Sequence, residues 1–377
     1  MFNVGQSDIQ WMRRALELAA KGQGHTSPNP MVGAVLVDAN GQLLGEGWHH
    51  RTGEAHAEVN AIADAVARGN SIRGATLYVT LEPCSTTGRT GPCVEAILKA
   101  GIARVICAAT DPNPAHQGRG LELLRQAGAE VVSGVLSEES RKLNRAFNHW
   151  IVKRTPFVTL KSAMSLDGKI ATAAGESQWI TGEASRRHAM EFRVQVDAIL
   201  VGVNTVQADD CALTVRLPGY EWKRLRRIVL DSQARTPLTS KIVSDERRSL
   251  TTIVVSGNAP VDRVRVLRQN VEVWQLPADA EGRPRISCLL EKLGSESVTH
   301  LLVEGGATVA DSFLRQGFVH RIHFYYAPRI IGGQKALSSV SGKGVKHLLE
   351  TPLIQNPEWM PLGDDFLLMA DVAPVSR

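Results

Sequence analysis

The sequence predicts an α/β protein of two domains. At 377 residues the chain is longer than one ordinary hydrophobic core accommodates. Helix and strand patterns alternate along both halves, which is typical of layered α/β architecture. A charged helix pattern runs from Ser137 to His149, and strand patterns restart at Pro156. We therefore place the domain boundary near residue 150, with predicted domains of residues 1–150 and 151–377.

The composition is that of a soluble globular protein, with 43% hydrophobic and 21% charged residues. The N-terminal residues form an amphipathic helix pattern rather than a signal peptide, and no apolar run is long enough to predict a membrane span. Five cysteines, an odd number without an export signal, indicate a reducing compartment. We therefore expect a cytoplasmic protein.

The charge is mildly positive, with a net charge of +5 and a pI near 9.0. Basic pairs such as Arg13-Arg14 and Arg247-Arg248 are scattered and form no continuous stripe. We therefore expect no nucleic-acid partner and no membrane partner, whereas small phosphorylated molecules suit this charge. A homo-oligomer is compatible with the sequence.

The predicted elements of the first half follow one another closely, and the turn signal Asp38-Ala39-Asn40-Gly41 joins its first two strands into a hairpin. The hydrophobic patterns predict helices over residues 7–21, 56–69, 94–101 and 118–128, and strands over residues 31–37, 43–48, 75–84, 103–110 and 130–135. The later strands are expected to be parallel, because helices connect them.

The second half repeats the α/β theme. The patterns predict strands over residues 156–164, 198–203, 226–231, 251–256, 271–276, 300–306, 321–328 and 366–371. Helices are predicted over residues 182–196 and 307–318, and residues 278–285 read as a loop.

Three metal-ligand side chains fall on consecutive elements of the first domain. His56 opens a helix pattern, Cys84 follows Pro83 at a strand end, and Cys93 lies at a helix start, where the helix dipole favours a thiolate. One histidine and two cysteines are a set that Zn²⁺ takes, and three protein ligands leave a fourth position for water. The sequence therefore predicts a catalytic zinc site.

Glu58 lies two residues after His56, where the helix is only beginning, so both side chains can face one site. A carboxylate there can take a proton from an activated water and pass it to a leaving amine, as general base and then general acid. We predict Glu58 as the catalytic residue.

Other interpretations of these residues stay open at this point. Two cysteines at this spacing also occur through packing, and Cys107, Cys211 and Cys288 are expected to be ordinary buried or loop residues. A structural zinc module would need a fourth protein ligand, which His49 or His50 could supply.

The order His-Ala-Glu, Pro-Cys and a second Cys resembles the zinc-dependent cytidine deaminase superfamily, although the usual Cys-x-x-Cys is lengthened here. Further segments resemble the deaminase half of the bifunctional riboflavin-biosynthesis deaminase/reductase family across residues 7–150. These segments are residues 28–35, 47–58, 80–85, 88–93 and 110–114. The resemblance implies a three-layer α/β/α zinc deaminase domain.

The resemblance also implies hydrolytic removal of the 2-amino group from a diaminopyrimidinone ribosyl phosphate. It implies His56, Cys84 and Cys93 as zinc ligands and Glu58 as proton shuttle. The implied substrate-binding residues are Asn29, His49, Arg89, Asp111 and Asn113.

The first domain departs from the family at two places. The family commonly carries a histidine after Cys-Ser, where this chain has Thr86, and Thr90-Gly91-Pro92 replaces Thr-Pro-Pro. The predicted zinc ligands are unaffected by either change. A threonine hydroxyl reaches less far than an imidazole, so any cost is expected in substrate binding before metal binding.

The second domain has no G-x-G-x-x-G motif, so a standard Rossmann dinucleotide site is not predicted. Residues 303–308 instead lead from a strand through two glycines into a helix, a junction that can bind phosphate but is also an ordinary tight turn. Several segments between residues 155 and 340 resemble the reductase half of the same family. That resemblance implies a dihydrofolate-reductase-like α/β domain that uses NADPH for hydride transfer to the C1′ carbon of a ribosyl group, which becomes a ribityl chain.

The implied reductase positions form two sets. The cofactor-binding set is Ala163, Trp179, Thr205, Asp209, Gly306, Ala307, Thr308, Val309, Ala310, Asp311 and Ser312. The substrate-binding set is Ser177, Arg193, Leu213, Arg216, Ser232 and Glu304. Arg193 and Arg216 suit phosphate binding, and Trp179 can pack on a nicotinamide. Cys211 stands where the family usually has proline, and no residue is predicted as proton donor.

A different class of enzyme remains as the alternative, namely a nucleic-acid or free-nucleoside deaminase with an unrelated second domain. The missing basic stripe and the segments at residues 29–33 and 110–114 argue against it. We therefore expect a two-step enzyme with Zn²⁺ and NADPH as cofactors.

Overall fold

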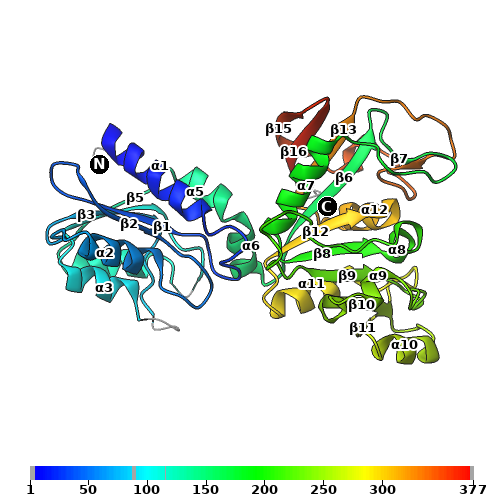
Figure 1. Cartoon of the computed structure of the whole chain (residues 1–377), viewed down its shortest axis with the longest axis horizontal. Helices are drawn as coiled ribbons and strands as arrows, with labels where there is room; N and C mark the ends of the chain where they lie inside the picture. The colour runs from blue at the N-terminus through cyan, green and yellow to red at the C-terminus, as the bar shows by residue number, and fades with distance from the viewer. Residues whose placement is uncertain (1–4, 87–90, 115, 374–377) are drawn as a thin grey trace. The chain divides into compact units, whose positions relative to one another are not determined.

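The computed structural model describes residues 5–86, 91–114 and 116–373. The chain divides into two compact units, Met1–Arg154 and Thr155–Arg377 (Figure 1). The first unit extends past residue 150 because helix α6 (Arg145–Lys153) belongs to it. Along these described ranges, no helix is both long enough and apolar enough to cross a membrane.

A five-stranded sheet forms the centre of the first unit, in the order β2-β1-β3-β4-β5. The strands are β1 (Gly33–Val37), β2 (Leu43–Trp48), β3 (Thr76–Leu81), β4 (Arg104–Ala109) and β5 (Glu130–Ser133). β1 pairs antiparallel with β2 and β3, which confirms the predicted hairpin. β3, β4 and β5 pair in parallel, as the connecting helices predicted.

Helices cover both faces of this sheet, so the unit has the three layers that were expected (Figure 1). One face packs against α1 (Gln6–Ala20) and α5 (Ser137–Leu143). The other packs against α2 (Ala57–Ala67), α3 (Cys93–Ala100) and α4 (Arg119–Gln126). Alternate residues of β1 divide between the two cores, because successive strand side chains point to opposite faces.

The charged pattern over residues 137–149 forms two helices, α5 and α6, rather than the single helix expected. The break falls at Asn144, whose side chain is 3% exposed. Its Oδ1 accepts the Met31 N–H at 2.8 Å, and its Nδ2 donates to the Met31 carbonyl at 2.8 Å. The end of α5 is therefore fixed by a tertiary contact that the sequence pattern does not encode.

A nine-stranded sheet forms the second unit, in the order β11-β10-β9-β8-β12-β6-β13-β16-β15. Its strands are β6 (Phe157–Ser165), β8 (Ala198–Gly202), β9 (Arg226–Leu230), β10 (Thr251–Ser256), β11 (Glu272–Leu276), β12 (His300–Gly305), β13 (Arg321–Ala327), β15 (Ile354–Leu362) and β16 (Asp365–Val372). A small separate sheet joins β7 (Lys169–Ala171) and β14 (Leu337–Ser338). All pairs from β11 to β13 are parallel, and β16 and β15 add antiparallel.

Two apolar cores lie on the two faces of this sheet. The helices are α7 (Glu183–Gln195), α8 (Val203–Asp209), α9 (Lys241–Ser244), α10 (Val261–Arg268), α11 (Ile286–Ser295) and α12 (Ala307–Arg315), with 3₁₀ turns η1 (Arg248–Leu250) and η2 (Leu348–Glu350). Only α7 and α12 were predicted. α8 was missed because Val203 continues the apolar run of β8, so the pattern contains no boundary between strand and helix.

The parallel strands β8, β12 and β6 are neighbours, so their carboxyl ends open at one edge of the sheet. In open α/β sheets this edge is where ligands bind.

Candidate active sites

Three ligand atoms meet at one point in the first unit. The Nδ1 of His56 lies 3.3 Å from the Sγ of Cys93 and 3.6 Å from the Sγ of Cys84. All three ligand atoms lie within 4.8 Å of one another. Tetrahedral Zn²⁺ with ordinary Zn–N and Zn–S bonds would place such atoms about 3.6 Å apart, so the cluster fits the ion.

The backbone around the cluster explains this convergence. His56 is the N-cap of α2, Cys93 is the first residue of α3, and Cys84 follows the end of β3. The Cys93 N–H donates to the Cys84 Sγ at 3.3 Å, and the Val94 N–H donates to the Cys84 carbonyl at 3.2 Å. The start of α3 therefore holds Cys84, and its free amide groups favour negative charge there.

The two thiols differ in acidity because they share one hydrogen bond. That hydrogen bond lowers the pKa of Cys84, and His56 adds to the effect. The same hydrogen bond and burial raise the pKa of Cys93. All five cysteines are free thiols, so the cluster is not a disulfide.

Glu58 lies in the first turn of α2 and is 3% exposed. Burial raises the pKa of its carboxyl to about 7. A carboxyl with this pKa exchanges a proton readily near neutral pH, as a general base that later acts as an acid requires.

Neither candidate for a fourth ligand joins the cluster. The Nε2 of His49 contacts the Asn29 Nδ2 at 3.2 Å, and its Nδ1 contacts the Ala55 carbonyl at 3.1 Å. His50 is exposed, and its ring packs at a tilt against Trp48 with the ring centres 4.3 Å apart. Within the described ranges the cluster has three protein ligands, which favours a catalytic site over a structural module.

A cavity of about 490 Å³ opens beside the cluster. It is lined by the predicted residues His56, Glu58, Cys84, Asn29, His49, Asp111 and Asn113. Thr86 and His116 also line it, and Phe147, Trp150 and Ile151 of α6 form an apolar wall. Arg89, the remaining predicted substrate residue, lies outside the described residues.

The loop that carries Asp111 and Asn113 is fixed by Glu82, a buried carboxylate that the sequence analysis did not single out. Glu82 accepts backbone N–H groups from Asp111 at 3.1 Å, Gly118 at 2.9 Å and Gly120 at 2.8 Å. Its signal in the sequence is a carboxylate that directly follows the apolar strand β3. Burial raises the pKa of Asp111.

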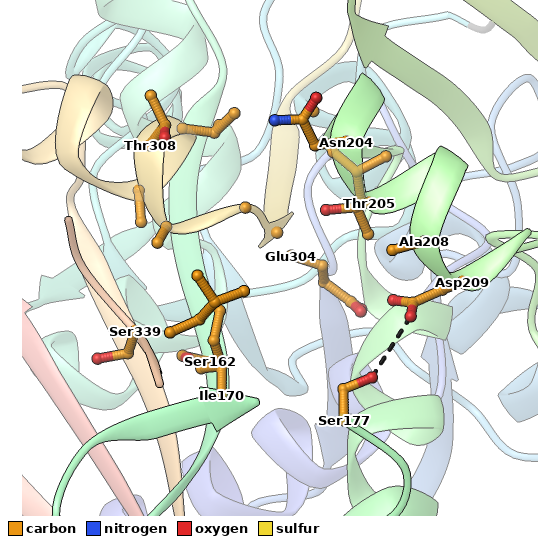
Figure 2. A pocket seen from close by; sticks show the side chains of 18 of the residues that line it. Ser162, Ile170, Ser177, Asn204, Thr205, Ala208, Asp209, Glu304, Thr308 and Ser339 are labelled. Atoms are coloured by element: carbon orange, nitrogen blue, oxygen red, sulfur yellow. Dashed lines mark hydrogen bonds between the residues drawn. The ribbon is translucent and has the colours of Figure 1, made fainter. Parts of the chain in front are cut away.

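A second cavity, of about 790 Å³, opens at the carboxyl ends of β8, β12 and β6 (Figure 2). It is lined by every predicted cofactor residue except Asp311, and by every predicted substrate residue of this unit except Arg216. Figure 2 shows Thr205, Glu304 and Asp209 on one side of the cavity in this view, and Ser162, Ile170 and Ser339 on the other. The Ser177 hydroxyl donates to Asp209 at 3.4 Å.

Asp311 and Arg216 lie elsewhere. Asp311 is buried and pairs with Arg315 one turn further along α12. Arg216 is exposed, although it lies close enough to Glu304 to lower the pKa of that carboxyl.

Glu304 is the centre of a buried charge network. The Arg193 Nε and Nη2 donate to its two oxygens at 2.8 Å each, while the Arg193 Nη1 donates to the Thr214 carbonyl at 2.8 Å. Burial acts to raise the pKa of Glu304, but Arg193, Lys161 and Arg216 together lower it to about 2. Arg193 therefore holds Glu304 ionised and in place, rather than presenting a free fork to a phosphate.

Lys161 is a lining residue to which the sequence analysis gave no role. Its Nζ lies 3.8 Å from Glu304 and 5.7 Å from the centre of the Tyr325 ring. Burial lowers the pKa of its ammonium, and Glu304 acts against that shift. A single charged residue within strand β6 was the available signal.

The junction between β12 and α12 places backbone against the cavity. Gly306 has a φ of +80°, a conformation that suits glycine. A Cβ at Gly305 would lie 3.2 Å from the Thr205 hydroxyl. The glycine therefore lets α8 pack closely against this junction. Backbone N–H groups at the start of α12 can bind a ligand phosphate, as residues 303–308 suggested.

Comparison with known proteins decides the family. Residues 5–109 match the model for the cytidine and deoxycytidylate deaminase zinc-binding region, and residues 156–368 match the RibD C-terminal domain. The riboflavin biosynthesis protein RibD of Actinobacillus pleuropneumoniae is 42% identical over 96% of this chain and 94% of its own length. The Escherichia coli RibD is 38% identical over 96% of this chain and 98% of its own.

The chain belongs to the RibD family.

Solved structures of the RibD family agree with this result. Acinetobacter baumannii RibD superposes with a TM-score of 0.86 at 35% identity, covering 98% of this chain and 99% of its own. A Thermotoga maritima protein superposes with a TM-score of 0.81 at 34% identity, covering 97% and 99%. It is described as a diaminohydroxyphosphoribosylaminopyrimidine deaminase/5-amino-6-(5-phosphoribosylamino)uracil reductase.

The family settles the class of both units. The chain is a bifunctional enzyme with a zinc-type deaminase domain and a reductase domain of the dihydrofolate-reductase-like fold. The predicted cofactors, Zn²⁺ and NADPH, fit these two domains.

Proposed function

We propose that the first unit deaminates 2,5-diamino-6-(5-phosphoribosylamino)pyrimidin-4(3H)-one. We propose that the second unit then reduces the product, 5-amino-6-(5-phosphoribosylamino)uracil, at its ribosyl group to give the ribityl chain. The convergence of His56, Cys84 and Cys93 beside the buried Glu58 carries this proposal, because it joins a metal ligand set to a proton carrier in one cavity.

In the deaminase site, His56, Cys84 and Cys93 would hold Zn²⁺. When bound, Zn²⁺ supplies a Lewis acid that activates water for attack on the ring carbon bearing the 2-amino group. Glu58 takes the proton released from this water and passes it to the departing amino group, which leaves as ammonia. Asn29, His49, Asp111 and Asn113 line the cavity and orient the pyrimidine.

In the reductase site, the turn at Gly306 and the residues around Thr205 and Trp179 would hold NADPH. When bound, NADPH supplies the hydride that adds to C1′ as the C1′–O4′ bond breaks. We assign Lys161 as the acid that gives a proton to O4′, because its ammonium faces the cavity and has a lowered pKa. Glu304, held by Arg193, keeps that ammonium in position.

The proposal is tested by supplying the diaminopyrimidinone ribosyl phosphate to the purified full-length protein, with and without NADPH, and identifying the products by mass. We expect the deaminated compound without NADPH and the deaminated, reduced compound with it. Products of any other mass contradict the assigned substrates.

Glu58→Gln isolates the first step. We expect at least about a 100-fold loss of ammonia release with zinc content unchanged, since the glutamine cannot carry the proton. The same variant should still oxidise NADPH when given the deaminated intermediate. Retained deamination in Glu58→Gln would rule out the proton-shuttle role.

A further inference from the structure

His116 lines the deaminase cavity, although neither the proton shuttle nor the metal cluster uses it. It lies on the loop between β4 and α4, beyond Asp111 and Asn113. Its ring Nδ1 is buried and has no hydrogen-bond partner in the described part of the chain. A buried polar atom without a partner is unfavourable, so a ligand that supplies a partner is favoured at this position.

The backbone holds this imidazole in place. The His116 N–H donates to the Asn113 carbonyl at 2.9 Å, and the His116 carbonyl accepts the Arg119 N–H at 2.8 Å. Glu82 anchors both ends of the loop through its hydrogen bonds to Asp111 and Gly118. The ring is therefore presented to the cavity by a fixed loop.

The charges of the cavity indicate which ligand group the imidazole meets. Four carboxylates line it, those of Glu54, Glu58, Glu82 and Asp111, and no lysine or arginine does so among the residues that the structure describes. A ribosyl phosphate brought into this cavity needs hydrogen-bond donors.

Three histidines line the cavity, and two of them are already engaged. His56 belongs to the metal cluster, and both ring nitrogens of His49 have partners. His116 lies near enough to Asp111 to act on the pKa of that carboxyl, yet its Nδ1 has no hydrogen-bond partner, so judged over the described ranges it is the cavity imidazole left to bind an anion.

We propose that His116 is a substrate-binding residue of the deaminase, which donates a hydrogen bond from its imidazole to the phosphate of the pyrimidine ribosyl phosphate. The proposal rests on the proposed deaminase function and adds a residue that fixes the phosphorylated end of the substrate. Thr86 lines the same cavity, so the imidazole missing from the Cys84 loop is supplied from a different loop.

The test compares His116→Ala with the unaltered full-length protein in steady-state deamination. Two substrates are used, the diaminopyrimidinone ribosyl phosphate and its dephosphorylated form. We expect KM for the phosphorylated substrate to rise about tenfold, which corresponds to about 1.4 kcal/mol, with kcat unchanged. KM for the dephosphorylated substrate should stay the same, because it lacks the group that His116 binds.

Controls separate binding from structural damage. Arg119→Ala changes an exposed cation at the start of α4 that does not line the cavity, and should leave both KM values unchanged. Zinc content and NADPH-dependent reduction of the deaminated intermediate report on folding within the same molecule. His116→Gln, which keeps a side-chain N–H donor, should recover part of the lost affinity and provides a second variant if His116→Ala folds poorly.

Equal changes in KM for both substrates, or no change for either, would overturn the role of His116. Absence of deamination by the unaltered protein would instead contradict the proposed function itself.

Discussion

Burial sets the acid–base behaviour of single side chains in both units. Glu58 and Glu304 are both buried carboxylates, yet the pKa of Glu58 is raised to about 7 and that of Glu304 is lowered to about 2. The difference arises because Glu304 is surrounded by Arg193, Lys161 and Arg216, whereas desolvation dominates at Glu58. One carboxyl can therefore exchange protons near neutral pH, and the other stays ionised.

Lys161→Met tests the proton donor of the reduction. Methionine keeps much of the length of the side chain but carries no proton, so we expect reduction of the deaminated intermediate to fall at least about 100-fold. NADPH binding and deamination in the same chain should be retained. Lys153→Met, which changes an exposed lysine of α6, is the matched control. Near-normal reduction by Lys161→Met would exclude the acid role.

The pH profile adds a second readout for Lys161. An ammonium that acts as an acid must be protonated, so the reduction rate falls as pH rises through its pKa. This fall is the alkaline limb of the pH–rate profile. Burial lowers the pKa of Lys161, so we expect the alkaline limb below the usual range for lysine. Glu304 raises the pKa of Lys161, so Glu304→Gln should move the limb to still lower pH. An unchanged alkaline limb in Glu304→Gln would contradict the electrostatic coupling between Glu304 and Lys161.

At the scale of elements, short contacts fix where the site residues lie. α2 carries Glu58, with His56 as its N-cap, and packs directly on β2, where Gly47 leaves no room for a side chain. A Cβ at Gly47 would lie 2.5 Å from the Ala61 N and 2.8 Å from the Ala57 carbonyl. The glycine thus sets the distance between α2 and the sheet.

Gly47→Ala should push α2 away from β2. We expect unfolding free energy of the first unit to fall by about 1–3 kcal/mol, with lower zinc occupancy and slower deamination. Reduction by the second unit should be unaffected. Gly257→Ala makes the same change where the nearest atom, the Leu276 carbonyl oxygen, would lie 3.6 Å away. Equal stability of Gly47→Ala and the unaltered protein, measured by chemical denaturation, would contradict the close-packing argument.

At the scale of the whole molecule, the two chemistries are carried by separate sets of residues. The predicted metal ligands lie between His56 and Cys93, whereas the described residues that line the reductase cavity run from Leu160 to Ser341. Each unit has its own sheet and its own apolar cores. Loss of one cofactor should therefore remove one activity.

Removal of zinc provides the test at this scale. A chelator should abolish deamination while reduction of the deaminated intermediate continues at its original rate, and added Zn²⁺ should restore deamination. Parallel loss of both activities on chelation, measured on the full-length protein, would show that the metal supports more than the first site.

The sequence by itself predicted the α/β class, a division into two domains and a candidate metal ligand set, because these predictions depend on local patterns and on residue chemistry. The helix break at Asn144 could not be predicted, since tertiary hydrogen bonds to Met31 cause it. The boundary between β8 and α8 at Val203 could not be predicted either, since an uninterrupted apolar run conceals it. Only the structure shows that Arg193 binds Glu304, that Lys161 lines the reductase cavity and that His116 lines the deaminase cavity. These assignments depend on which groups remain unpaired once distant segments pack together, and only the folded chain determines that.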